Sequence, residues 1–136
     1  MGIFDKLATK IFGNKHEKDI KEINPVIDEI NQHFDSYKNL SNDELRGKTN
    51  EFRERIKDYL SEFDTRILEV QKQADSDEID IDDKEAIYNQ IDELKEERDK
   101  HLEEILNQIL PAAFAVVKET ARRFKENTSL SVKATE

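Results

Sequence analysis

Apolar residues recur along most of this 136-residue chain at steps of three and four, which is the spacing of one face of an α-helix. Four runs follow this spacing, over residues 3–12, 15–37, 41–74 and about 84–110, and a fifth begins at Pro111. No segment reads convincingly as a strand. The pattern therefore predicts an all-α fold.

The second run has a narrow, heptad-like seam suited to packing on another helix. Pro25 interrupts this run, and proline inside a helix removes a donor and clashes with the preceding turn. The residues favour a helix that begins at Asn24–Pro25, with Asn24 as the N-cap, over a longer helix kinked at Pro25. The seam consists of Ile20, Ile23, Ile27, Ile30, Phe34 and Tyr37.

The third and fourth runs predict an antiparallel helical hairpin. Ser41 and Glu44 form a capping box that starts the third helix, which continues to about Ala74. Residues 75–83 lack helical spacing and predict a turn, after which Asp82 or Asp83 caps the fourth helix. Two seams joined by a short loop fold back on each other. They comprise Leu45, Phe52, Ile56, Tyr59, Phe63, Ile67 and Val70 on one arm, and Ile87, Ile91, Leu94, Leu102, Ile105 and Ile109 on the other, with Arg98 at a seam position.

Pro111 predicts the end of the fourth helix and the start of a fresh one that reaches about Asn127. Its small residues Ala112, Ala113 and Ala115 permit close approach of another helix. The predicted buried face of this last helix consists of Phe114, Val117, Ala121 and Phe124.

Composition narrows the possible functions. Charged residues make up 40% of the chain and the net charge is −10, which argues against nucleic-acid binding because that needs a basic surface. Cysteine is absent, so disulfides, thiolate nucleophiles and cysteine zinc sites are excluded. No apolar run approaches the roughly 20 residues that span a bilayer.

Motifs for catalysis or metal binding are missing. The acidic segment from Asp75 fails the EF-hand pattern, because isoleucine and aspartate stand where a ligand and a glycine are needed. Arg46–Thr49 imitates only the end of a phosphate-binding loop and follows a helix cap, not a strand. The histidines His16, His33 and His101 are scattered and read as surface residues. We expect no catalytic, cofactor or metal site in this chain.

The first run is amphipathic, with lysines beside its apolar face. Such a helix is attracted to anionic lipid headgroups and buries its apolar side chains among them. The same face can instead pack on the domain or on the rest of a larger protein. The residues alone leave both readings open.

Two segments resemble the amino-terminal region of the SecA family of preprotein-export motors. One is Leu40–Ile56, which reads LSNDELRGKTNEFRERI, and the other is Leu110–Arg123, which reads LPAAFAVVKETARR. The resemblance implies a cytoplasmic ATPase, peripheral on the inner face of the cell membrane, that pushes preproteins through the SecY channel. It assigns contact with anionic lipid and the channel to Ile3, Phe4, Lys6, Leu7, Lys10, Ile11 and Phe12.

The resemblance also implies a domain organisation. Residues 1–13 would be the amphipathic helix, 14–57 and 110–127 a SecA-like scaffold, 58–109 an inserted hairpin that departs from the common family pattern, and 128–136 a disordered tail. ATP and Mg²⁺ would belong to the full-length parent and not to this part. The alternative is a stand-alone coiled-coil adaptor that binds a protein partner through its hairpin.

Overall fold

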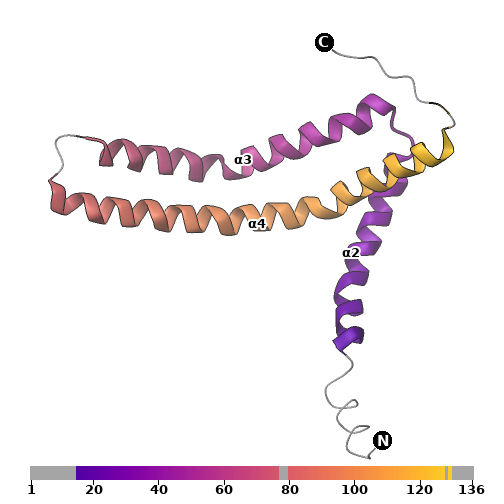
Figure 1. The fold of residues 1–136 in the computed structure, drawn as a ribbon, viewed down its shortest axis with the longest axis horizontal. Coiled ribbons are helices and arrows are strands. Elements are labelled where there is room, and N and C mark those ends of the chain that lie inside the picture. The colour runs from indigo at the N-terminus through magenta and orange to yellow at the C-terminus, as the bar shows by residue number, and fades with distance from the viewer. Residues whose placement is uncertain (1–14, 77–79, 128, 130–136) are drawn as a thin grey trace, which may run out of the picture. The chain divides into compact units, whose positions relative to one another are not determined.

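The computed structural model describes residues 15–76, 80–127 and 129, and helix is the regular secondary structure found there. The helices are α2 (Lys15–Tyr37), α3 (Asn42–Ala74) and α4 (Ile81–Glu126) (Figure 1). The predicted all-α fold is confirmed. The predicted helix over residues 3–12 lies outside the described residues, as does the predicted tail except for residue 129.

The sequence signals at the start of α3 agree with the structure. The helix begins at Asn42, directly after the predicted cap Ser41, and ends at Ala74 as predicted. The start of α4 differs from the prediction, because the helix begins at Ile81 and not after Asp82 or Asp83. The carbonyl oxygen of Asp80 accepts a hydrogen bond from the Lys84 amide at 3.2 Å, so the helical hydrogen bonding already starts there.

Both prolines lie inside helices, which corrects two predictions. α2 runs through Pro25, so the predicted start at Asn24 is wrong, and α4 runs through Pro111 without a restart. In α4 the buried positions Ile109 and Ala112 stand on either side of the proline at helical spacing. Packing on both sides offsets the roughly 3 kcal/mol that an interior proline costs.

The chain divides into two compact units. One contains Asn42–Leu110, and the other contains the residues up to Ser41 together with those from Pro111 onward. The first unit contains 22 of the 32 acidic residues but only 11 of the 22 basic ones. The chain's net negative charge of −10 therefore comes entirely from that unit, and the other is close to neutral.

In the Asn42–Leu110 unit, α3 and the first part of α4 lie antiparallel, as the two seams predicted (Figure 1). Its most deeply buried side chains are Leu60 and Ile105, at 2% and 1% exposure. The predicted seam residue Tyr59 is 38% exposed, so Leu60 takes its place in the core. Nearer the loop, a cluster formed by Ile67, Val70, Ala74, Ile91 and Leu94 closes the hairpin, with Ile87 packed against it.

Polar side chains also join the two arms of the hairpin. Each hydrogen bond joins a residue of α3 to one of α4. Residues nearer the loop in α3 bond to residues nearer the loop in α4, as an antiparallel register requires. The pairs are Arg55 with Gln108 at 3.2 Å, Tyr59 with Glu104 at 3.1 Å, and Asp64 with Arg98 at 2.6 Å.

In the other unit, the C-terminal half of α2 packs on the last part of α4. Lys118 donates to the side-chain oxygen of Asn31 at 2.6 Å, and its ammonium lies 4.4 Å from the centre of the Phe34 ring. Tyr37, the last residue of α2, is 7% exposed. This contact positions the polar cluster described next.

Candidate functional site

The site residues predicted from the sequence lie outside the described residues. They are Ile3, Phe4, Lys6, Leu7, Lys10, Ile11 and Phe12, and their role in membrane or channel contact stays a prediction.

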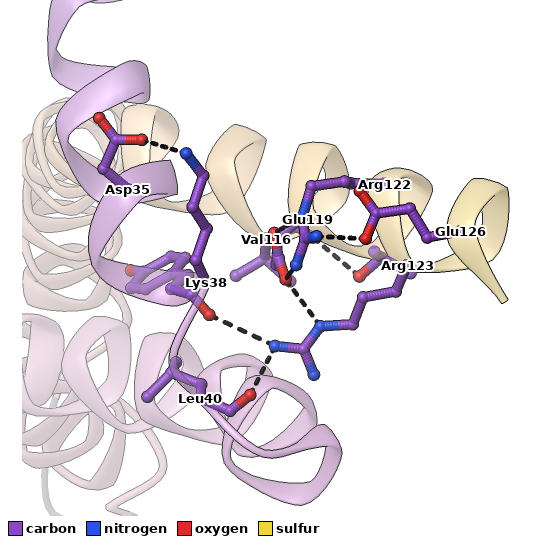
Figure 2. Close-up of polar contacts among 10 residues, drawn as sticks. Asp35, Lys38, Leu40, Val116, Glu119, Arg122, Arg123 and Glu126 are labelled. Atoms are coloured by element: carbon purple, nitrogen blue, oxygen red, sulfur yellow. Dashed lines mark hydrogen bonds and ion pairs between the residues drawn. The ribbon is translucent and has the colours of Figure 1, made fainter.

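The main polar constellation of the described residues surrounds Glu119 on α4. We call it the Glu119 cluster, and it consists of Glu119, Arg122, Arg123 and Glu126 (Figure 2). Glu119 is 0% exposed, yet each of its carboxylate oxygens accepts N–H groups from a guanidinium. Arg122 donates to both oxygens at 2.7 and 2.8 Å, Arg123 donates to one at 2.7 Å, and Arg122 also pairs with Glu126.

Arg123 extends the cluster from α4 to the end of α2. Its guanidinium donates to the carbonyl oxygen of Leu40 at 2.6 Å and to that of Tyr37 at 3.3 Å, as Figure 2 shows for Leu40. The Tyr37 oxygen also accepts the amide of Leu40 at 3.1 Å. Because carbonyls at a helix C-terminus lack intrahelical partners and carry partial negative charge, a cation there satisfies and stabilises them.

The electrostatics of Glu119 follow from its two cationic neighbours. The hydrogen bonds from Arg122 lower the pKa of Glu119 most, those from Arg123 add to this, and together they outweigh burial and hold the pKa at about 2. The pKa of Arg122 is raised above its usual value by Glu119 and then by Glu126. A carboxylate held so firmly in its charged form, with both oxygens occupied, is a poor general base. The cluster therefore joins α4 to the end of α2 through charged, fully hydrogen-bonded side chains.

The predicted buried face of the last helical segment is wrong. Phe114, Val117 and Phe124 are 55%, 66% and 57% exposed, and Ala121 is exposed as well. The face that is buried instead carries Pro111, Ala112, Ala115 and Glu119. We call the exposed set, Phe114, Val117, Ala121 and Phe124, the α4 stripe.

The described histidines do not form a site. His33 is exposed, and its ring lies 5.9 Å from that of Tyr37. His101 is half-buried, contrary to the prediction of a surface residue, with its ring centre 4.4 Å from that of Phe63. Over residues 15–76 and 80–127, no group of three or more potential ligands is placed to hold a metal ion.

None of the described helices combines the length and the apolar character needed to cross a bilayer.

One signal for the Glu119 cluster is present in the sequence, although the hydrophobic pattern does not contain it. Glu119, Arg122 and Arg123 stand at i, i+3 and i+4, the spacing at which side chains on a helix meet. Charged residues at that spacing are common here, so the spacing alone does not separate a buried cluster from solvated pairs. Only the burial of Glu119 makes that distinction.

The fold and the site define a class: an all-α module in which a buried polar cluster joins one helix to the end of another. Residues 8–134 match the SecA DEAD-like domain family. The chain belongs to the SecA family, as the resemblance of its two segments predicted.

Relatives in this family match nearly the whole chain. The protein translocase subunit SecA of Chloroherpeton thalassium is 48% identical over 118 residues, or 87% of this chain. That of Parabacteroides distasonis is 41% identical over 131 residues, or 96%, and that of Christiangramia forsetii 44% over 134 residues, or 98%. Residues 58–109 thus lie inside the region shared with these relatives.

The chain spans only 11% to 12% of the length of these relatives. No solved structure matches it.

Proposed function

We propose that this chain is the amino-terminal helical module of a SecA-type protein translocase, which attaches and scaffolds and performs no chemistry itself. The observation that carries the proposal is the α4 stripe, which is exposed among the described residues and lies, except for Phe124, in the Leu110–Arg123 segment that resembles the family. An exposed apolar face of this kind marks an interaction site. Because this chain matches only 11% to 12% of the length of the relatives, the remainder of a SecA-type polypeptide is the occupant we propose for the stripe.

The same proposal extends to the activity of the full-length protein. The relatives are named as protein translocase subunits, and we infer that ATP and Mg²⁺ bind outside this chain and drive preproteins through the SecY channel. The protein would then work in the cytoplasm, bound peripherally at the inner face of the cell membrane.

We further propose the domain organisation implied by the resemblance. Residues 14–57 and 110–127 would form the family scaffold, residues 58–109 an inserted hairpin, residues 1–13 the attachment helix and 128–136 a tail. The relatives' match across residues 58–109 supports a hairpin shared by these relatives.

Charge distribution supports attachment through the amino-terminal segment. The Asn42–Leu110 unit has a net charge of −11 and is repelled by anionic headgroups, whereas residues 1–18 contain four lysines and two acidic residues. We assign the contact with anionic lipid and the channel complex to the apolar face and lysines of residues 3–12.

Cosedimentation with vesicles tests this assignment. We expect Lys6→Gln with Lys10→Gln to weaken binding to anionic vesicles roughly tenfold or more, since each lysine near such a surface contributes about 1 kcal/mol. The matched control, Lys57→Gln with Lys100→Gln, makes the same charge change on the hairpin and should leave binding unchanged. Equal losses in both variants would contradict the assignment.

Titration calorimetry with ATP tests whether this chain binds nucleotide. We expect no saturable heat of binding to the 136-residue chain, with or without Mg²⁺. A saturable isotherm that is lost on competition with ADP would place nucleotide binding in this chain and refute the proposal.

A further inference from the structure

The seam of α2 is covered at one end and open at the other. Toward the C-terminus Ile30 and Phe34 are half-buried and Tyr37 is buried. Toward the N-terminus the same stripe continues with Ile20, Ile23 and Ile27, which are 44%, 54% and 44% exposed. Three isoleucines in a row on one helix face form an apolar patch with no cover among the described residues.

We propose that residues 3–12 form a helix that folds back on α2 and covers this patch, with Phe4 against Ile27, Ala8 against Ile23 and Ile11 against Ile20. This packing does not depend on the proposed function. Only its competition with lipid, described below, does.

The spacing of the two apolar stripes supports this pairing. Going backward along the chain, Ile11, Ala8 and Phe4 are separated by three and then four residues. Going forward, Ile20, Ile23 and Ile27 have the same steps of three and four. In an antiparallel pair of helices, two stripes with the same spacing lie opposite each other. All three proposed residue pairs can therefore form in a single register.

The connection between the two segments is short enough to favour the intramolecular contact. Gly13 and Asn14 separate Phe12 from Lys15, where α2 begins. Two residues suit an αα-hairpin, and glycine tolerates the conformation that ends a helix. In this register Phe12 lies level with Asp19, about 6 Å along α2 from Lys15, and the connection has to cross to the neighbouring helix over that step. Three extended residues reach about 10 Å, so the connection must be nearly extended.

Tethering and charge favour this occupant over a second molecule. A segment held by a short connection has an effective concentration in the millimolar range. The residues of α2 include six acidic and three basic side chains, whereas residues 1–14 have Lys6 and Lys10 against Asp5. The two segments therefore have net charges of opposite sign.

A stored and a released state follow from this pairing, if the proposed function holds. Phe4 and Ile11 would be buried either against α2 or in the membrane surface, and they cannot be in both. Anionic lipid would then release the helix from α2.

Engineered cysteines test the pairing cleanly because the natural chain has none. The test variant is Ala8→Cys with Ile23→Cys, oxidised in dilute solution. The matched control is Ala8→Cys with Glu22→Cys, which moves one thiol about 100° around the axis of α2 and off the isoleucine face. Ile23 and Glu22 are both exposed, so neither change removes a contact among the described residues, and circular dichroism checks that helicity is retained.

The expected result is an intramolecular disulfide in the Ile23 variant that closes about tenfold faster, or more, than in the Glu22 variant, since facing positions bring the Cβ atoms toward the roughly 4 Å required. Equal rates would overturn the pairing. Faster formation of linked dimers would also overturn it, because a second copy would then cover the patch.

Anionic vesicles separate this inference from the proposed function. Slower closure on adding vesicles supports both the pairing and its competition with lipid. Unchanged closure while the chain cosediments overturns the competition. Fast closure in a chain that does not bind vesicles overturns the lipid role and leaves the fold-back pairing supported.

Discussion

Arg98 of α4 donates through Nε to Asp64 Oδ1 of α3 at 2.6 Å, at a place in the hairpin where the seam spacing favours an apolar residue. The hydrogen bond that Arg98 donates to this carboxylate raises the pKa of Arg98 above its usual value. The side chains remain 31% and 45% exposed, and pairs with such access to water contribute little stability. We infer that this pair fixes the register of the hairpin more than it stabilises it.

Replacing the pair with Asp64→Leu and Arg98→Leu together should leave the free energy of unfolding unchanged or raise it by about 1 kcal/mol, because apolar side chains at a seam position gain burial. Urea denaturation of the double variant and both single variants measures this as a double-mutant cycle. A loss of more than about 2 kcal/mol in the double variant would show that the ion pair is a main source of stability.

Glu119→Gln should destabilise the chain by about 2 kcal/mol, because the change removes a buried acceptor charge from Arg122 and Arg123. Thermal unfolding followed by circular dichroism at pH 7 measures the loss. Glu126→Gln is the matched control, since Glu126 is exposed and pairs only with Arg122, and it should cost less than 1 kcal/mol.

The stability that Glu119 contributes should depend on pH. Its pKa is about 2 in the folded chain against an ordinary value of 4.5, so the unfolded state binds the proton more readily. The contribution is fully present above about pH 4.5 and is lost as the pH falls toward 2. Unfolding midpoints of the natural chain and Glu119→Gln should therefore converge between pH 5 and pH 2. A constant difference over that range would contradict the lowered pKa.

Gly47→Ala should stabilise α3. Apart from its chain neighbours and the backbone of its own helix, a Cβ at Gly47 would meet no heavy atom within 4 Å, and the residue lies inside α3, where alanine is favoured by about 1 kcal/mol. An increase in the unfolding midpoint confirms the expectation. Asn50→Ala, also exposed on α3, is the control for a gain in helix propensity without the glycine effect, and its increase should be smaller.

Val117→Asp should leave the stability of the isolated chain within about 0.5 kcal/mol, because Val117 is 66% exposed. Ala115→Asp, two residues away and 0% exposed, should unfold or severely destabilise it, since a carboxylate would be buried without a partner. The comparison by thermal unfolding distinguishes the two faces of α4. Equal destabilisation would mean that the α4 stripe is covered.

Local signals in the sequence predicted the hairpin well. The cap at Ser41 predicted the start of α3 to the residue, and seam positions such as Ile91 and Ile105 proved buried. These signals act over a few residues, through side chains that satisfy nearby backbone groups or share one helix face. The polar bridge from Arg123 to Leu40 joins positions 83 residues apart, and no local pattern encodes it.

The predictions that proved wrong lie where the local preference of a residue type and the packing of the helices favour different structures. Proline disfavours a helix interior, yet the buried face of α4 continues across Pro111, and its packing outweighs the local cost. Large side chains favour burial, yet Phe114 is exposed while Ala115 is fully buried. Small residues allow the helices to approach closely, and only the arrangement of the elements shows which face does so.

The register of the hairpin limits how its two arms can change in length. The hydrogen-bonded pairs across the hairpin run in opposite directions along its two arms. Successive positions on α3, namely Arg55, Tyr59 and Asp64, pair with successively earlier positions on α4. An insertion in one arm alone would displace every pair beyond it. Evolution can therefore lengthen or shorten the hairpin by matched changes of about seven residues in both arms, or by altering the turn that joins them.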